Sequence, residues 1–186
     1  MRRTYRMLYR LGITPWNHLG IPAPLAAVVE GPPRLPTGQA VDLGCGTGEQ
    51  ARYLARHGWS VTAVDYTPEA IAAARRQDPT GRVTWRVADV TESATVDPDG
   101  ILTATVTLML DNGCLHGIPR PVRLGWGATV NTLAAPDAVL LVRAAPRRHR
   151  ALGPGGINSP DLTALLGDRW HPAAMLHPGW YRYIRV

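Results

Sequence analysis

Residues 41–48 read Val-Asp-Leu-Gly-Cys-Gly-Thr-Gly, and this stretch constrains the architecture of the chain more than any other feature. It follows a short apolar run and precedes a predicted helix, which is the setting of a nucleotide-binding turn. Glycines let the backbone turn sharply and approach a ligand closely. The dinucleotide pattern GxGxxG is not met, because Glu49 stands where its third glycine belongs. The pattern is GxGxG, with Asp42 two residues before the first glycine.

Short apolar segments alternate with helical segments along the chain. We expect strands at 40–43, 60–64, 83–87, 103–110 and 138–143, and helices at 3–11, 24–30, 49–57, 68–76, 121–133 and 160–166. Thr67 and Ser159 are the predicted N-caps of the helices that follow them. Such alternation produces βαβ units and a parallel sheet covered on both faces.

The last segments, 170–176 and 180–186, flank Pro178-Gly179 and predict a closing hairpin. The predicted fold class is therefore α/β, a Rossmann-like, mostly parallel doubly wound sheet with a C-terminal antiparallel hairpin. We expect residues 1–186 to form a single domain, with 1–36 as an N-terminal lid or extension. Ligands of such sheets bind beyond the carboxyl ends of the strands.

The glycine motif resembles the first motif of the class I S-adenosylmethionine-dependent methyltransferases, and the resemblance covers residues 39–145 well. In that family this loop wraps the methionine part of the cofactor. The resemblance therefore implies that S-adenosyl-L-methionine is the cofactor. It also implies which residues of the loop bind it: Asp42, Gly44, Cys45, Gly46 and Gly48.

Two further sites follow the next strands. Asp65 ends the second strand, about 20 residues past the glycine turn, where an acid accepts hydrogen bonds from ribose hydroxyls. Tyr66 is placed to stack beside the adenine. In the family, an acid after the third strand accepts a hydrogen bond from the adenine amino group, and the next backbone amide meets the ring. The resemblance assigns these roles to Asp89 and Val90.

Residues 110–117, after the fourth strand, lie beside the reactive methyl group in the family. The resemblance makes Asp111 a cofactor-binding and catalytic candidate and Asn112 a substrate-binding candidate. The segment lacks the Asp/Asn-Pro-Pro-aromatic motif, which disfavours adenine-N6 or glutamine methylation. Its Asp-x-Gly-Cys-x-His pattern is similar to small bacterial enzymes related to thiopurine S-methyltransferase. These often carry Thr-Pro-Trp-Asp near the N-terminus, and here Asn17 replaces the acid.

Methyl transfer requires orientation of the acceptor and exclusion of water. Tyr9 and Trp16 are predicted to contact the substrate from the N-terminal lid. If the acceptor is a hydroxyl or a protonated amine, a base assists, and His116 is the catalytic and substrate-contacting candidate. A histidine that only bonds to nearby backbone is an equally open interpretation. Residues 153–159 form either a wall of the substrate pocket or a connector.

Composition restricts the remaining classes. The two cysteines, Cys45 and Cys114, are expected to be free thiols that lie near each other, and the histidines show no metal-ligand spacing. No apolar run is long enough for a membrane span, and no signal-peptide pattern is present, so we expect a cytoplasmic protein. The net charge is +6, and all 20 basic residues are arginine, in a composition typical of GC-rich genomes.

We therefore expect a methyltransferase that acts on a small-molecule oxygen, nitrogen or sulfur nucleophile, with specialised metabolism as one setting. Nucleic-acid binding is disfavoured, because the basic clusters at 2–10 and 147–150 are not interleaved with aromatic residues. Two alternatives stay open. One is an RNA or protein methyltransferase. The other is a cofactor-binding protein or cyclase that does not methylate. Nothing in the sequence predicts the oligomeric state.

Overall fold

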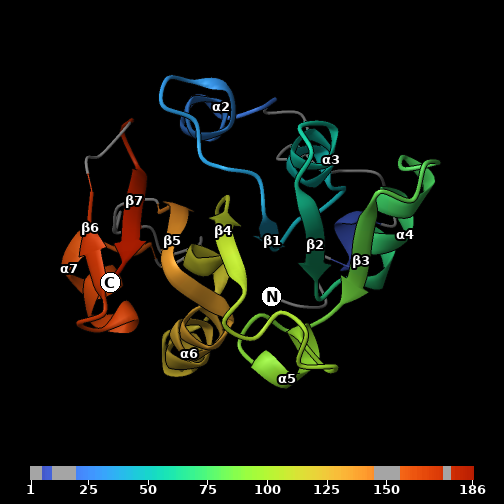
Figure 1. The fold of residues 1–186 in the computed structure, drawn as a ribbon. Coiled ribbons are helices and arrows are strands. Elements are labelled where there is room, and N and C mark those ends of the chain that lie inside the picture. Colours follow the sequence, from blue (N-terminus) through green and yellow to red (C-terminus); the bar gives the residue numbers. More distant parts are fainter. Residues whose placement is uncertain (1–5, 10–19, 145–155, 174–176) are drawn as a thin grey trace.

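The structure is a computed structural model, and it describes residues 6–9, 20–144, 156–173 and 177–186. Its centre is a seven-stranded sheet in the order β3-β2-β1-β4-β5-β7-β6 (Figure 1). Neighbouring strands from β3 to β5 run parallel, whereas β7 is antiparallel to both β5 and β6. The bounds of the strands are β1 Gln39–Leu43, β2 Ser60–Asp65, β3 Val83–Val87, β4 Val106–Asp111, β5 Ala134–Arg143, β6 Trp170–Pro172 and β7 Trp180–Arg185. The predicted α/β fold with its closing hairpin is confirmed.

Helices cover both faces of the sheet, as alternating strand residues require. One face packs against α2 (Ala23–Glu30), α3 (Glu49–Arg56) and α4 (Pro68–Arg76) through Ala40, Leu108 and Leu141. The other face packs against α5 (Ser93–Val96), α6 (Arg123–Leu133) and α7 (Ser159–Leu166) through Val41, Met109 and Val142. Two short 3-10 turns, η1 (Leu115–Gly117) and η2 (Arg120–Val122), connect β4 to α6.

The glycines of α6 allow close packing of this helix. A Cβ on Gly125 would lie 2.3 Å from the carbonyl oxygen of Thr91, and one on Gly127 would lie 2.2 Å from that of Leu165. No side chain fits at either distance, so the helix accepts the intrinsic cost of glycine in exchange for direct backbone contact. These contacts set the depth at which α6 lies on the sheet.

Several predicted boundaries are corrected. Strand β4 starts at Val106, not at 103, because Ala104 has φ 55° and the Thr105 hydroxyl donates back to the Ile101 carbonyl. Strand β5 starts at Ala134, directly after α6, so the predicted start at 138 was late. The predicted helix at 121–133 begins as the turn η2 and becomes α-helical at Arg123.

Of the two predicted caps, Thr67 is confirmed in position and Ser159 is wrong. The N-cap of α7 is Asn158, whose side chain accepts a hydrogen bond from the Asp161 amide at 3.0 Å, while Ser159 already lies inside the helix. Thr67 does hold the N-cap position of α4, but its hydroxyl makes no capping hydrogen bond. Asn158 caps the helix because its carboxamide oxygen reaches the amide of the third helical residue.

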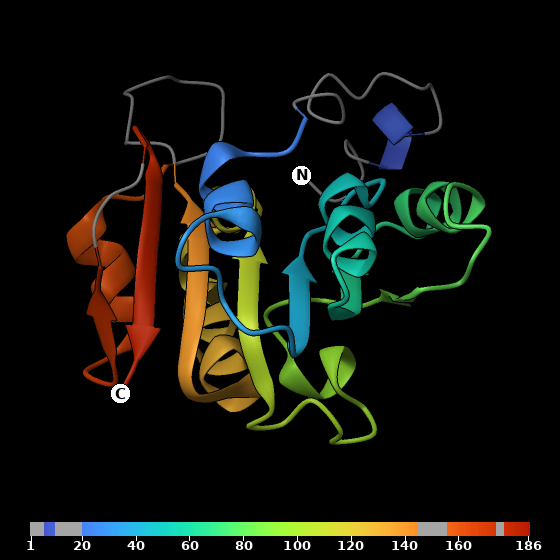
Figure 2. The ribbon, with the colours of Figure 1, turned by 45° about the horizontal axis from the view of Figure 1, so that its top comes forward.

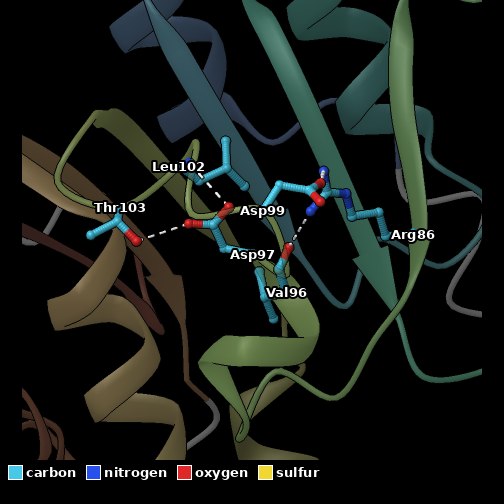
Figure 3. Close-up of polar contacts among 6 residues, drawn as sticks. All are labelled: Arg86, Val96, Asp97, Asp99, Leu102 and Thr103. Atoms are coloured by element: carbon cyan, nitrogen blue, oxygen red, sulfur yellow. Dashed lines mark hydrogen bonds and ion pairs between the residues drawn. The ribbon is translucent and has the colours of Figure 1, made fainter.

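The connection between α5 and β4 has no regular pattern in the sequence, yet it is well bonded (Figure 3). The buried carboxylate of Asp97 accepts hydrogen bonds from the Leu102 amide at 3.1 Å and the Thr103 hydroxyl at 2.9 Å. Arg86 of β3 donates to the Val96 carbonyl and pairs with Asp99 at 3.1 Å. These bonds hold α5 against β3 and determine where β4 begins.

Candidate cofactor and acceptor site

The glycine loop joins β1 to α3 at the carboxyl edge of the sheet. Gly44, Gly46 and Gly48 have φ values of 76°, 55° and 76°, a region that side chains disfavour. The amides of Gly44 and Cys45 donate to the Val64 carbonyl at 2.8 and 2.9 Å, which ties the loop to β2. The sequence therefore places glycine where the backbone must turn.

A second set of contacts explains why two of these glycines cannot be larger. A Cβ on Gly44 would lie 2.5 Å from the Cβ of Cys114, and one on Gly48 would lie 2.1 Å from Cη2 of Trp85. The loop is therefore pressed between the segment after β4 and the indole of β3. Cys45 and Cys114 are both free thiols, as predicted.

Three carboxylates gather around the loop, one from the end of each of β1, β2 and β4. Asp42, Asp65 and Asp111 are 1%, 7% and 0% exposed. Burial, followed by repulsion from Asp111 and Asp65, raises the pKa of Asp42 to about 8. Burial likewise raises the pKa of Asp111 to about 7, against the opposing effect of its hydrogen bonds. Burial and the repulsion among these carboxylates keep Asp42 protonated at neutral pH, and a bound cation would offset that repulsion and favour its ionised form.

These residues fit the expected cofactor. Oδ2 of Asp42 is buried and has no hydrogen-bond partner among the described residues, so a ligand donor is needed to satisfy it. S-adenosylmethionine carries a sulfonium and an ammonium group, and both positive charges suit a pocket lined by carboxylates. Asp65 accepts hydrogen bonds from the Gly46 amide at 3.1 Å and the Thr67 amide at 2.8 Å. It therefore links the glycine loop to the start of α4.

Asp111 is the most heavily bonded carboxylate of the site. Its Oδ1 accepts from the amides of Gly113 at 3.0 Å and Cys114 at 2.7 Å, and the Leu115 amide reaches both oxygens. Its Oδ2 also accepts from Nε1 of Trp126 at 3.0 Å. These hydrogen bonds fix the shape of the loop after β4.

Two side chains of the same loop each carry one unsatisfied atom. Oδ1 of Asn112 and Nδ1 of His116 are buried without a hydrogen-bond partner among the described residues. Burial, followed by the charges of Arg143 and Arg123, lowers the pKa of His116. The imidazole is therefore neutral at pH 7, with a lone pair available to accept a proton.

The remaining predicted residues are spread around this centre. Tyr66 follows β2 and is half-buried. Oδ1 of Asp89 accepts from the amide and hydroxyl of Thr91, at 3.0 and 2.7 Å, and the side chain of Val90 is buried in the core. Tyr9 lies half-buried in the short helix at 6–9. Trp16, Asn17 and residues 153–155 lie outside the described part of the chain.

Residues 6–9 lie over α3 and α4 at the carboxyl side of the sheet (Figure 2). Nε of Arg6 approaches Oε2 of Glu69, on α4, to 3.5 Å. Further along the chain, the Gln50 side chain on α3 donates to the Gly20 carbonyl at 3.2 Å. The N-terminal region therefore contacts the two helices that begin at the glycine loop and after Asp65.

Four residues of the site were not predicted: Trp85, Arg123, Trp126 and Arg143. Trp85 contacts Gly48 and Trp126 bonds to Asp111, and both partners are distant in sequence. No local sequence pattern predicts these contacts. Arg123 carried one available signal, a lone arginine at the start of a helix whose other face is apolar. Within the described residues, no helix combines the length and apolar character that a membrane span requires.

Comparisons with known proteins agree with this geometry. A family profile described as a methyltransferase domain matches residues 40–124. The chain is 27% identical, over 84% of its length and 68% of the relative, to a 2-heptyl-1-hydroxyquinolin-4(1H)-one methyltransferase of Mycobacteroides abscessus. It is 30% identical to a ubiquinone biosynthesis O-methyltransferase of Xanthomonas campestris, over 74% of this chain. The chain spans 55% of the length of that second relative.

Solved structures share the fold. A structure from work on the conversion of a disulfide bond into a thioacetal group during echinomycin biosynthesis superposes with a TM-score of 0.78 at 20% identity, covering 100% of this chain and 93% of the other. The Burkholderia thailandensis 1,6-didemethyltoxoflavin-N1-methyltransferase, solved with S-adenosylhomocysteine, gives 0.69 at 21% identity, covering 99% and 84%. Together with the glycine loop and its carboxylates, these sequence matches support a class I S-adenosylmethionine-dependent methyltransferase.

Proposed function

We propose that this protein methylates a hydroxyl group of a small molecule, with His116 as the base that receives the hydroxyl proton. The observation that carries the proposal is the pair of buried, unsatisfied atoms beside the glycine loop, Oδ1 of Asn112 and Nδ1 of His116. Unsatisfied buried polar atoms are rare in folded proteins and commonly mark a ligand site. Both atoms are acceptors: Nδ1 of His116 can take the proton that a hydroxyl loses during transfer, and Oδ1 of Asn112 can accept from a second donor of the same molecule.

On the cofactor side, Asp42 and the glycine loop hold the methionine part and Asp65 holds the ribose. Asp89, the Val90 amide and Tyr66 are proposed to contact the adenine. When bound, the cofactor supplies an activated methyl group on a sulfonium. Asp111 fixes the loop that carries Asn112 and His116 through its bonds to the Gly113, Cys114 and Leu115 amides.

On the acceptor side, His116 would take the hydroxyl proton at Nδ1, and Oδ1 of Asn112 would accept a hydrogen bond from a second donor of the acceptor molecule and so orient it. The lowered pKa of His116 keeps this nitrogen free of a proton near neutrality. We also propose that residues 1–36, with Tyr9 and Trp16, act as a lid that excludes water. The contacts of Arg6 with Glu69 and of Gln50 with Gly20 support that placement.

The named relatives support a small-molecule acceptor. One is named for a 1-hydroxyquinolinone and the other as an O-methyltransferase of ubiquinone biosynthesis, so both names point to small aromatic molecules. A match to a ribosomal RNA small subunit methyltransferase C of Alcanivorax borkumensis spans only 36 residues. It therefore gives the RNA alternative little support. The narrower likeness to thiopurine S-methyltransferase stays a prediction.

The test is product formation with defined acceptors. Purified protein and S-adenosylmethionine would be incubated with 2-heptyl-1-hydroxyquinolin-4(1H)-one, a catechol, a thiopurine and total RNA, and methylated products would be measured by mass spectrometry. We expect O-methylated product from an aromatic hydroxyl and none with Asp65→Ala. Methylation of RNA alone would replace the proposal with the RNA alternative. Calorimetric binding of the cofactor without any product would support the non-methylating alternative.

A further inference from the structure

The guanidinium of Arg123 lies at the start of α6 and is 5% exposed. It donates to three backbone carbonyls. Nε bonds to the Ile118 oxygen at 2.8 Å, Nη1 to the Gly156 oxygen at 2.9 Å and Nη2 to the His116 oxygen at 3.3 Å. One side chain thus joins two segments that are distant in sequence.

The two segments have different origins in the fold. His116 and Ile118 belong to the loop after β4, which carries the proposed base and Asn112. Gly156 lies between β5 and α7, and Ile157 next to it is 1% exposed within the core. Both segments stand at the carboxyl edge of the sheet, where the acceptor is expected to bind.

The number and direction of these bonds suit arginine alone. The planar guanidinium offers five donors in a fixed fork, whereas lysine offers a compact ammonium that cannot reach three separated carbonyls. Burial of a charge is costly, and such a cost is offset when the charged group makes strong hydrogen bonds. Nothing in the parallel sheet itself requires this residue, because α6 already packs through Trp126, Val130 and Leu133.

We propose that Arg123 is a positioning residue for the acceptor, which fastens the His116 loop to the Gly156 segment and so fixes two walls of the acceptor pocket relative to each other. The proposal rests on the proposed function, because it assigns the acceptor to the side of the site where His116 lies. The cofactor residues Asp42 and Asp65 are not bonded to Arg123 by any of these contacts, so cofactor binding is expected to be independent of it.

The matched control is Arg185, at the end of β7. Its Nη1 also donates to backbone carbonyls, those of Asn131 and Ala134, where α6 meets the start of β5. Arg185→Lys therefore removes an arginine–carbonyl clamp of the same kind from the opposite edge of the sheet. It tests what such a loss does to stability without affecting the candidate site.

The first measurement is amide hydrogen exchange of wild type, Arg123→Lys and Arg185→Lys without any acceptor. We expect exchange at 112–118 and 156–158 to become about tenfold faster in Arg123→Lys and to stay unchanged in Arg185→Lys. The dissociation constant of S-adenosylhomocysteine, measured by calorimetry, should stay within about twofold in both variants. Unchanged exchange at the two segments, or equal loosening in both variants, would overturn the proposal.

The second measurement is steady-state kinetics with an acceptor that wild type methylates. Arg123→Lys should raise the KM for the acceptor about tenfold and leave the KM for S-adenosylmethionine within about twofold. The reason is that the His116 loop and the Gly156 segment are proposed to contact the acceptor and not the cofactor. Equal loss for both substrates would contradict a positioning role. If wild type methylates no acceptor, the proposed function fails, while the exchange result still decides whether Arg123 joins the two segments.

If Arg123→Lys does not fold, the proposal is tested in the wild-type protein by measuring solvent exchange of the Nε–H proton of Arg123. Its NMR signal should be protected from solvent exchange at least about tenfold relative to that of an exposed arginine, and an acceptor probe should increase the protection. An Nε–H that exchanges as fast as those of exposed arginines would overturn the proposal.

Discussion

The indole of Trp85 lies directly against Gly48, so that a Cβ on Gly48 would come within 2.1 Å of Cη2. Trp85 is held in turn by its Nε1, which donates to Oδ2 of Asp78 at 3.0 Å, and by its carbonyl, which accepts from Arg75 at 2.8 Å. The last glycine of the loop is therefore required by a neighbour from β3 as well as by its own φ of 76°.

Gly48→Ala is expected to destabilise the protein through both effects. The strained backbone costs about 1–2 kcal/mol, and the clash with Trp85 adds about 1–3 kcal/mol. Gly81→Ala is the matched control, because Gly81 has φ 62° with nothing within 4 Å of the added carbon. Urea denaturation should show a larger loss of unfolding free energy for Gly48→Ala. Equal losses would mean that Trp85 moves aside without cost.

This contact shows where sequence-based prediction succeeds and where it ends. The glycine loop, the parallel strands and the closing hairpin follow local rules of periodicity and turn chemistry, and each was predicted. Trp85 follows no local rule that links it to Gly48, because β3 reaches the loop only after two βα units have been wound. The same holds for Trp126, whose bond to Asp111 spans 15 residues.

Errors in the boundaries have a similar cause. The threonines at 103 and 105 favour a strand by propensity, but the Asp97 carboxylate binds the Thr103 hydroxyl and a positive φ at Ala104 turns the chain. Tertiary bonds outweigh propensity at such positions. The family motifs name candidate site residues such as Asp42 and Asp65, but they do not name Arg123, whose partners come from two separate loops.

Asp65→Asn should weaken binding of S-adenosylmethionine by about tenfold or more. The substitution keeps the shape of the side chain but removes the negative charge and one acceptor oxygen, so the carboxamide cannot accept from the Gly46 amide, the Thr67 amide and a ligand together. Isothermal titration calorimetry measures the effect. Asp99→Asn, on the surface ion pair with Arg86, removes the same charge and should leave binding unchanged. Wild-type affinity in Asp65→Asn would remove this residue from the cofactor site.

The raised pKa of Asp42 predicts how stability depends on pH when no cofactor is present. The folded protein holds the proton up to about pH 8, whereas the unfolded chain releases it near 3.8. Between these values the folded state binds more protons, so stability falls as pH rises and the loss ends near pH 8. Asp111, with a pKa of about 7, adds to the same trend.

Asp42→Asn should therefore reduce the pH dependence and stabilise the cofactor-free protein at pH 8 by about 1–3 kcal/mol, while it weakens cofactor binding. Thermal unfolding from pH 5 to 8, with and without S-adenosylhomocysteine, measures both effects. Glu92→Gln, outside the cluster, provides a control for the loss of a carboxylate. A variant that is less stable than wild type at pH 8 would show that Asp42 makes a stabilising contact in its ionised form.

His116→Gln should lower the rate of methyl transfer at pH 7 by about 10²–10⁴-fold, the usual contribution of a general base. Because the pKa of His116 is lowered from 6.5, the wild-type rate should rise with pH below neutrality and reach its plateau before pH 7. The variant should lack this rise and recover only as the acceptor hydroxyl ionises by itself. His171→Gln, an exposed histidine on β6, should behave as wild type. If His116→Gln keeps the wild-type profile with unchanged cofactor affinity, then the acceptor reaches the methyl group already ionised, and His116 serves only to complete the loop after β4.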